Sequence, residues 1–308
     1  MSDETRTDAS DKPRTDASDK PRTDASDKPR MRVNPRITER IAKAIIWSAA
    51  LLVMVVLLAI IIYILIKGLP VIDWQFLTEN PHNMGRDGGV FSTIIGTLMV
   101  VAVAIIIAVP FGIGTAFYLA EYTREGLFTR IVRFSAESLA GIPSIVYGLF
   151  GFLFFVIYLD LGWSVLSGGL TLAVMILPTI IRTSEEAIIT VPRSYREVSF
   201  SLGGTKWQTT LKAVFPSALR GVANGIILSI GRCIAETAAV VLTAGSTLRM
   251  PTSLFSPTRT MAVHFYILAR EGISMENAYG TAALLIILIF IINVVVNALI
   301  DRFVAKNR

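Results

Sequence analysis

Long uncharged apolar runs alternate with short polar segments along most of the chain. The first run, Ala44 to Ile66, has 23 residues, which exceeds the roughly 20 residues that a helix needs to cross a hydrocarbon core. Five further runs follow, each bounded by charged or turn-forming residues. The pattern predicts an all-α polytopic membrane protein with six spans, at about residues 44–66, 92–120, 138–159, 163–181, 221–246 and 277–300.

Interruptions within the runs predict local features of the spans. Pro110 and nearby glycines predict a kink near the end of the second span. Only Asp160 to Gly162 separate the third span from the fourth, which predicts a tight antiparallel hairpin. The fifth run contains Arg232 and Glu236, and its ends are the least well defined.

Composition agrees with this pattern. Hydrophobic residues make up 53% of the 308 residues, charged residues 17%, and the mean hydropathy is +0.61; this is too apolar for soluble domains. The single Cys233 excludes a disulfide framework or a cysteine cluster, and two histidines cannot hold a metal alone. We therefore expect no metal, no cofactor and no catalytic residue in this chain.

The N-terminal 30 residues differ from the rest. They contain Thr-Asp-Ala-Ser-Asp-Lys-Pro-Arg three times, beginning at Thr7, Thr15 and Thr23. Such a charge-balanced segment cannot bury enough apolar surface to offset chain entropy. We expect residues 1–30 to be a disordered cytoplasmic tail and residues 31–308 to form the transmembrane domain.

Basic residues predict the orientation. The segments 31–43, 121–137, 182–220 and 301–308 hold 16 Lys and Arg residues, and the alternate segments hold 5. Because Lys and Arg accumulate in cytoplasmic loops, both termini and segment 182–220 are predicted to lie in the cytoplasm. The net charge of +6 is explained in the same way, so nucleic-acid binding is not expected.

A polar segment from Arg182 to Pro216 interrupts the apolar second half of the chain. Pro192 suits the first turn of a helix, and apolar residues recur after it at helical spacing. Gly203 and Gly204 then end this helix. The apolar stripe consists of Tyr195, Val198 and Leu202.

A second short helix is predicted beyond the glycines. Thr205 and Gln208 fit a capping box, and the apolar face that follows consists of Trp207, Leu211 and Val214. The segment is thus predicted as two short helices, joined by a sharp turn, outside the hydrocarbon. Either it docks a partner or both apolar faces rest on the chain's own membrane domain, and the pattern alone leaves both readings open.

The spacing of Glu197, Gly203 and Pro216 resembles the cytoplasmic loop motif of bacterial ABC-importer permeases. The match departs from the usual pattern at Val198, Ser199, Ala213 and Phe215. Three further stretches resemble the PstA family of permeases from phosphate-specific ABC importers. They are Ala140–Gly148, Glu185-Glu186 with Val191-Pro192, and Gly231–Gly245.

The PstA resemblance implies a type I ABC-importer permease fold with cytoplasmic coupling helices, in the bacterial inner membrane and surrounded by lipid. It implies a PstC-like partner permease, a PstB-like ATPase dimer carrying ATP and Mg, a PstS-like periplasmic binding protein, and phosphate as substrate. The chain has no Gly-x-x-x-x-Gly-Lys-[Ser/Thr] motif, so nucleotide would bind elsewhere and this chain is not expected to be an enzyme. The resemblance places ATPase coupling at Arg193, Tyr195, Arg196, Glu197, Leu202, Gly203, Gly204 and Trp207.

Arg232 and Glu236 are the charges inside a predicted span. A charge at a helix centre costs roughly 2.5–3.5 kcal/mol on insertion scales, and residues four apart share a helical face. We interpret Arg232 as a positive point on an anion pathway, with Glu236 pairing it; the alternative is a purely structural salt bridge. Arg182 is either a second binding point on the anion pathway or a side chain that extends to the membrane interface.

Other functions remain open at this point. Within transporters, a PstC-type permease or one for another oxyanion, such as molybdate or sulfate, fits the same pattern. An intramembrane enzyme would need a nucleophile with a base, or metal ligands, at membrane depth; neither histidine lies in a predicted span. A membrane scaffold would lose nothing if Arg232 were neutralised.

Overall fold

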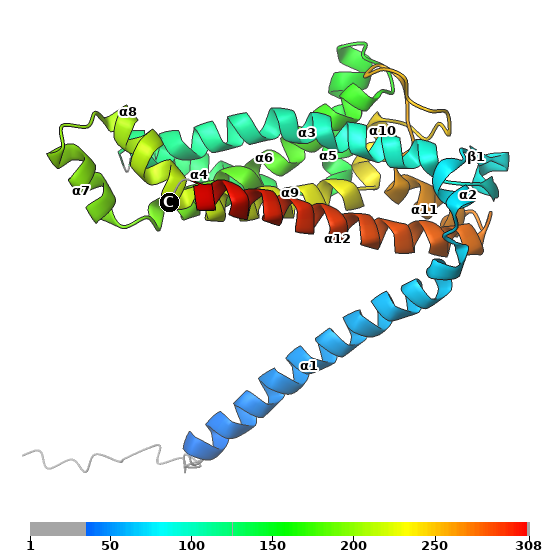
Figure 1. The fold of residues 1–308 in the computed structure, drawn as a ribbon, viewed down its shortest axis with the longest axis horizontal. Helices are drawn as coiled ribbons and strands as arrows, with labels where there is room; N and C mark the ends of the chain where they lie inside the picture. Colours follow the sequence, from blue (N-terminus) through cyan, green and yellow to red (C-terminus); the bar gives the residue numbers. More distant parts are fainter. Residues whose placement is uncertain (1–34, 125, 307–308) are drawn as a thin grey trace, which may run out of the picture. The chain divides into compact units, whose positions relative to one another are not determined.

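The computed structural model describes residues 35–124 and 126–306 (Figure 1). The predicted tail, residues 1–30, lies outside this range. The chain divides into two units, residues 1–56 and 57–308. The first unit is described only as the beginning of helix α1 (Pro35–Gly68), and the account below concerns the second unit.

Most of the described chain is helical. Five are long and apolar enough to cross a membrane, and a sixth span is obtained if one bent helix pair is counted as one. The prediction of six spans is confirmed when the bent helix pair is counted as one span. The five are Glu39–Val71, Phe91–Tyr122, Val165–Ile189, Lys206–Ala235 and Met275–Arg302.

The second, fourth and sixth spans are α3 (Phe91–Phe117), α6 (Val165–Ile189) and α12 (Met275–Lys306). Helix α3 passes through Pro110 without interruption and continues as a π-helical segment, η3 (Tyr118–Tyr122). The turn between the third and fourth spans, which includes Asp160 and Gly162, has positive φ at both of these residues.

The third span begins later than predicted. Helix α4 (Leu127–Ala140) and helix α5 (Ser144–Gly151) are bent by 100° across Gly141 to Pro143. Proline disfavours helical backbone at the residue before it and cannot donate a backbone hydrogen bond. The start predicted at about residue 138 is therefore wrong, because residues 138–140 belong to α4 on the other side of the bend. Helix α5 and the π-helical η4 (Phe152–Tyr158) form the apolar part of the span.

The fifth span also differs from the prediction. Helix α8 (Lys206–Thr209), π-helical η5 (Thr210–Val214) and α9 (Phe215–Ala235) follow one another without a break. The second short helix is therefore the start of the fifth span, not a separate element. Pro216 is tolerated because it lies in the first turn of α9, next to the π-helical segment. The span ends at Ala235, and a short helix, α10 (Ala238–Thr243), follows.

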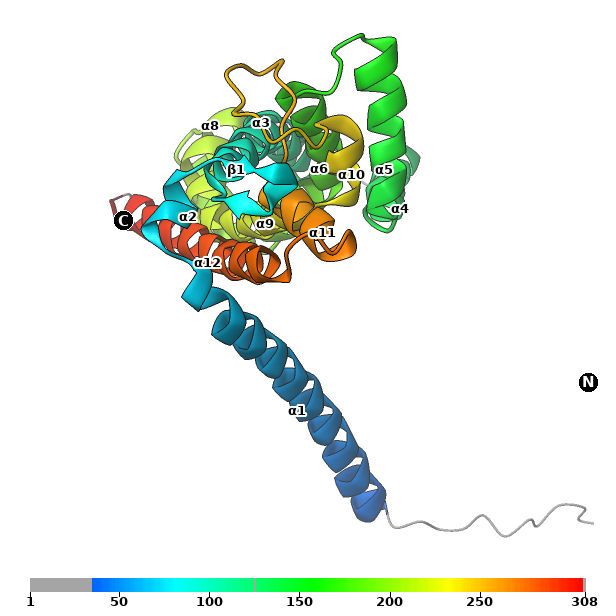
Figure 2. The same ribbon diagram turned by 90° about the vertical axis from the view of Figure 1, so that its right-hand side faces the viewer.

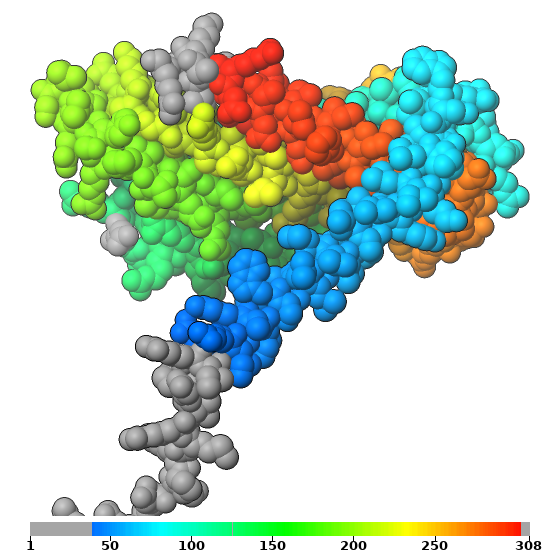
Figure 3. All heavy atoms as spheres, turned by 60° about the horizontal axis from the view of Figure 1, so that its bottom comes forward, coloured from blue at the N-terminus to red at the C-terminus, as the bar shows by residue number. Residues whose placement is uncertain are grey.

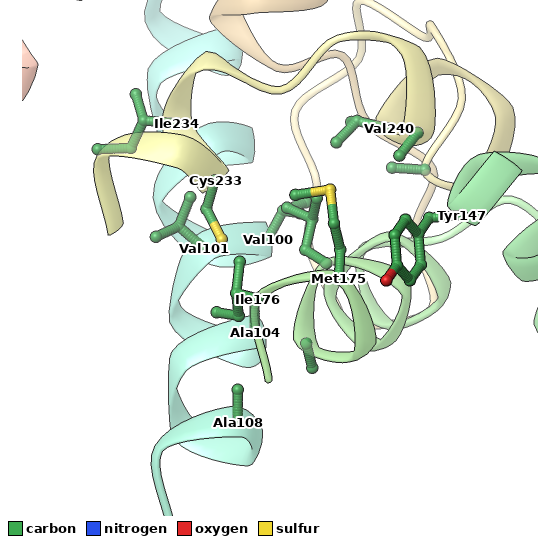
Figure 4. Close-up of a cluster of buried hydrophobic side chains, with 14 of the residues drawn as sticks. Val100, Val101, Ala104, Ala108, Tyr147, Met175, Ile176, Cys233, Ile234 and Val240 are labelled. Atoms are coloured by element: carbon green, nitrogen blue, oxygen red, sulfur yellow. The ribbon is translucent and has the colours of Figure 1, made fainter. Parts of the chain in front are cut away.

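The core lies where α3, α6 and α9 pack together (Figure 4). Small residues of α3, such as Ala104 and Ala108, face bulky residues of α6, such as Met175 and Ile176. Cys233 and Ile234 come from the last turn of α9, and Tyr147 comes from α5. All these side chains are buried, so α6 is the central helix of the bundle.

The two ends of the bundle carry different structures (Figures 1 and 2). One end carries α7 (Arg193–Ser201) and α8; we call it the α7 end. The other, the hairpin end, carries strands β1 (Pro81–His82) and β2 (Asp87–Gly88), which pair antiparallel with Pro81 opposite Gly88. Its helical elements are η1 (Leu69–Val71), α2 (Trp74–Thr78), η2 (Asn83–Gly85) and α11 (Met261–Arg270).

Close packing of α5 on α10 yields a stability prediction. A Cβ on Gly148 would lie 2.8 Å from the Ala239 Cα, whereas a Cβ on Gly114 would meet nothing within 4 Å. Alanine favours a helix over glycine by about 1 kcal/mol, and overpacking costs roughly 1–3 kcal/mol. Gly148→Ala should therefore lower the thermal unfolding temperature of the purified protein by several degrees, and Gly114→Ala should leave it unchanged or raise it. Equal midpoints for the two variants would contradict the close α5–α10 contact.

Candidate functional site

Local signals define the turn after α7 as the sequence predicts. The Gly203 N–H donates to Phe200 O and the Gly204 N–H donates to Ser199 O, each at 2.9 Å. This pair of bonds is the Schellman motif, which places a left-handed residue just after a helix. Gly203 occupies that position with φ of +79°, so the predicted helix end is confirmed and requires glycine.

The capping box after the turn is also confirmed. The Gln208 N–H donates to Thr205 Oγ1 at 3.3 Å, and the Thr205 N–H donates to Gln208 Oε1 at 3.0 Å. The Ser199 and Thr209 hydroxyls lie 2.8 Å apart, and Thr209 is buried. These bonds fix the angle at which α7 leaves the fifth span.

The apolar stripe of α7 is not covered by the described chain. Tyr195, Val198 and Leu202 are 50%, 60% and 84% exposed. The second stripe is mixed, because Trp207 and Leu211 are exposed and Val214 is buried. The reading in which both stripes rest on the membrane domain therefore fails for the first one. In Figure 3 the yellow-green spheres around α7 lie at the edge of the molecule.

Two depressions adjoin α7 and α8. A groove of about 810 Å³ runs between α7 and the fifth span, and its lining includes the α7 stripe together with Lys212 and Arg220. A second, apolar depression of about 380 Å³ lies between Trp207 and the end of the second span. The α7 stripe is exposed and the groove beside it is partly lined by polar residues such as Lys212 and Arg220. An exposed apolar patch with a polar rim is typical of a surface that binds a protein partner.

Some charged side chains of α7 are exposed to solvent, and one is turned toward the rest of the chain. Arg193 and Glu197 are exposed, and the Glu197 side chain has no hydrogen bond or ion pair within the described residues. Arg196 is turned inward, with 19% of its side chain exposed. Its Nε donates to Glu121 Oε1 at 3.0 Å, so Arg196 contacts its own chain instead of projecting outward.

Arg232 and Glu236 do not form the helical pair that the sequence suggests. Helix α9 ends at Ala235, and Glu236 is extended, with ψ of 128°. Glu236 Oε1 instead accepts the Ala239 N–H at 3.1 Å and caps α10. No ion pair joins Arg232 to Glu236 among the described residues, so that pairing is wrong: the i, i+4 relation needs a helix that continues past Glu236.

Arg232 is left with a distinctive environment. It is half-buried, lies in the last turn of α9, and has no hydrogen-bond or ion-pair partner among the described residues. Its neighbour Cys233 belongs to the buried core. A guanidinium that has no carboxylate partner among the described residues is available to an anion, since it offers a planar set of donors.

Arg182 lies near the α7 end of α6 and is paired. Its Nη1 lies 3.1 Å from Glu137 Oε1 and its Nε lies 3.1 Å from Glu186 Oε1. A second pair, Arg133 Nη2 to Glu185 Oε1 at 2.7 Å, lies beside it. These side chains line a cavity of about 230 Å³, whose carboxylates would repel an anion in this arrangement.

Two buried polar residues at the hairpin end were not found from the sequence. Arg259 is 6% exposed and His264 is 1% exposed. Arg259 Nε donates to Ser246 O at 2.7 Å, and its Nη1 lies 3.5 Å from His264 Nδ1. Burial lowers the pKa of Arg259; burial and then the Arg259 charge lower the pKa of His264 to about 3. No local sequence pattern indicates these two residues, because their burial depends on how the loop that contains Ser246 and Arg259 folds.

The described residues contain no group of three or more His, Cys, Asp or Glu side chains that could hold a metal ion. They also show no nucleophile set beside a base. The described residues thus supply an exposed apolar stripe on α7, an arginine without a hydrogen-bond or ion-pair partner in the last turn of α9, and a set of ion pairs at the α7 end.

Comparison with known proteins gives close relatives. A family described as binding-protein-dependent transport system inner membrane component matches residues 108–308. The chain is 30% identical over 277 residues to the probable ABC transporter permease protein YqgI of Bacillus subtilis (strain 168), covering 85% of this chain and 94% of the relative. It is 36% identical over 224 residues to the phosphate transport system permease protein PstA 1 of Mycobacterium tuberculosis (strain ATCC 25618 / H37Rv), covering 72% of each chain.

A PstC protein and a solved structure complete the comparison. The chain is 32% identical over 255 residues to the phosphate transport system permease protein PstC of Mesorhizobium japonicum, covering 73% of this chain and 78% of the relative. It resembles a chain of a bacterial ABC transporter involved in the import of the acidic polysaccharide alginate, with a TM-score of 0.60, 15% identity, and coverage of 87% and 99%. At that identity the likeness shows the fold alone.

His264 predicts a pH dependence of stability. Its pKa is about 3 in the folded chain and about 6.5 for an unperturbed histidine. Between these values the unfolded chain binds the proton and the folded chain does not, so stability is complete above about pH 6.5 and is lost as the pH falls, by at most about 1.4 kcal/mol per unit. Unfolding temperatures of the unaltered protein between pH 7 and pH 5 should fall more steeply than those of His264→Gln. Parallel slopes would contradict a buried neutral histidine.

Proposed function

This chain belongs to the family of binding-protein-dependent transport system inner membrane components, and on that premise we propose that it is the permease subunit of an ABC importer moving inorganic phosphate into the cytoplasm. The PstA relatives support phosphate as the substrate. The exposed stripe of α7 is the structural observation that carries the proposal, because it provides a place for an external source of energy to act.

The α7 end is proposed to face the cytoplasm, with both termini on the same side. The excess of Lys and Arg in segment 182–220 supports this orientation. An ATPase dimer of the PstB type, carrying ATP and Mg, would seat α7 through its exposed face and the groove beside it. Arg193, Tyr195, Glu197, Leu202 and Trp207 are exposed there, and the turn at Gly203 and Gly204 sets their direction.

The remaining partners follow from the same proposal. A PstC-like permease would supply the second half of the membrane pathway, and a PstS-like periplasmic protein would deliver phosphate at the hairpin end. The PstC relative supports the runner-up, in which this chain is the PstC-type subunit. Permeases for molybdate or sulfate remain the other alternative, since a separate binding protein selects the anion.

Arg232 is the residue we propose for the anion pathway. A charge at membrane depth is costly, so it is expected to face protein or water. Glu236 is engaged at the start of α10, which leaves the guanidinium free to bind phosphate oxygens in a forked geometry. Weak binding suits a pathway, because the anion must also leave.

Neutralising Arg232 tests the pathway. Arg232→Gln should reduce phosphate uptake at least tenfold in proteoliposomes that contain the whole complex, while the subunits still co-purify. Arg302→Gln is the control, because Arg302 is exposed near the end of α12. Normal uptake by Arg232→Gln would remove the pathway assignment and would favour a scaffold.

Gly203 tests the docking surface. Gly203 and Gly272 both have positive φ, +79° and +63°, with open space around them. A side chain costs roughly 1–2 kcal/mol in this backbone conformation, so the strain of Gly203→Leu and Gly272→Leu is matched. We expect only Gly203→Leu to lose ATPase binding or ATP-coupled uptake, because only that turn orients the docking helix. Unchanged coupling in Gly203→Leu would contradict the docking role.

Co-purification separates the transporter from the other classes. Recovery of an ATPase and a second permease with this chain supports the importer. Recovery of neither subunit would favour an intramembrane enzyme or a scaffold. The identity of the recovered permease also decides between the PstA and PstC types.

A further inference from the structure

We propose that Arg196 and Glu121 form an internal link that carries the motion of α7 into the second and fourth spans, and that Arg196 is not itself an ATPase contact. This inference rests on the proposed function, since it concerns how a docked α7 acts on the membrane helices. Arg196 is a positioning residue in this account, and Glu121 is its partner.

The first half of the link joins α7 to the second span. Glu121 lies in η3, the continuation of α3. Two nitrogens of Arg196, Nε at 3.0 Å and Nη2 at 2.5 Å, donate to the same Glu121 oxygen, Oε1. The Arg196 side chain is 19% exposed and that of Glu121 is 9% exposed. The pair is therefore sheltered from the solvent that weakens surface ion pairs.

The second half joins α7 to the fourth span. Arg196 Nη1 donates to Val191 O at 2.8 Å, and Nη2 donates to Ile188 O at 3.1 Å. Ile188 lies in the last turn of α6 and Val191 lies two residues beyond its end. The last carbonyls of a helix have no partner within the helix and carry a partial negative charge. A cation there satisfies both the hydrogen bonds and the charge. One side chain thus ties together α7, η3 and α6.

Helix α7 has two faces with different uses. Tyr195, Val198 and Leu202 are exposed, whereas Arg196 and Ser199, three residues apart, are turned toward the chain. Ser199 contacts Thr209 at the start of the fifth span. The inward face thereby anchors α7 to the second, fourth and fifth spans, and the outward face is left for the partner.

The two ion pairs of Arg182 at this end are more open. Arg182 is 54% exposed and its partners Glu137 and Glu186 are both 65% exposed, so those pairs can break and reform in water. Removing one member of the Arg196–Glu121 pair instead leaves a buried charge without its partner. A push on α7 is therefore transmitted through this link before the exposed pairs respond.

The test uses the whole complex in proteoliposomes with the binding protein outside and ATP inside. The measured quantity is the ratio of phosphate transported to ATP hydrolysed, together with the amount of ATPase subunit that co-purifies. Glu121→Gln and Arg196→Gln should each lower the ratio at least fivefold while the ATPase remains bound. Arg124→Gln is the control, because Arg124 is an exposed arginine three residues beyond Glu121.

A double-mutant cycle identifies the pair. If the two side chains act through each other, the variant with both substitutions should lose no more coupling than the worse single variant. Additive losses, or a normal ratio in Glu121→Gln, would overturn the link. Glu121→Gln preserves the shape of the side chain and remains informative where Arg196→Gln does not fold.

The outcomes separate this inference from the proposed function. In one outcome Arg196→Gln loses ATPase binding, while Glu121→Gln keeps normal binding and normal coupling. Arg196 would then be a direct contact with the ATPase, and the internal link would be overturned without affecting the proposed function. Absence of an ATPase from the unaltered complex would instead overturn the proposed function before any variant is compared.

Discussion

Backbone hydrogen bonding away from water is the constraint on which this structure depends. Inside hydrocarbon every N–H and C=O group needs a partner within the protein, so the chain crosses as helices and can interrupt them only where other groups supply the partners. The two interruptions follow this rule. Tyr147 donates to Leu139 O beside the bend at Pro143, and Glu236 accepts the Ala239 N–H where α9 gives way to α10. Each break is thus repaired by a side chain close to it in sequence.

The same constraint explains how much of the fold follows from the sequence. Apolar runs predict where helices cross. The turn after α7 was predicted in detail because its signals are local: a glycine in the left-handed region and a capping box from Thr205 to Gln208. Helix ends at membrane depth were less predictable. The bend at Gly141 to Pro143 has a local signal in Pro143, but the uncharged run continues through it, and hydropathy alone therefore gives one span there. The fifth span starts earlier than its apolar run because polar residues from Lys206 onward are already helical.

The candidate site shows the same division. The exposure of the α7 stripe agrees with its pattern, but the inward role of Arg196 depends on Glu121, which lies 75 residues away. The pairing of Arg232 with Glu236 failed for a local reason, since helical spacing has no meaning once the helix has ended at Ala235. Arg259 and His264 carry no motif at all, because burial by a folded loop creates their environment.

Three guanidinium groups of the membrane domain have different surroundings, and these surroundings determine what each group can bind. The guanidinium of Arg182 is half-exposed and holds two carboxylates, so it joins helix surfaces that water can separate. Arg196 holds one sheltered carboxylate, a carbonyl in the last turn of α6 and a second carbonyl just beyond that helix. This leaves few donors for a ligand and suits a fixed connection. Arg232 is half-buried and has no partner among the described residues, so its donors are the ones still free. We have proposed the unpaired guanidinium of Arg232 for the anion pathway and the fully engaged one of Arg196 for mechanical connection, because a side chain whose donors are already used has little left to offer a ligand.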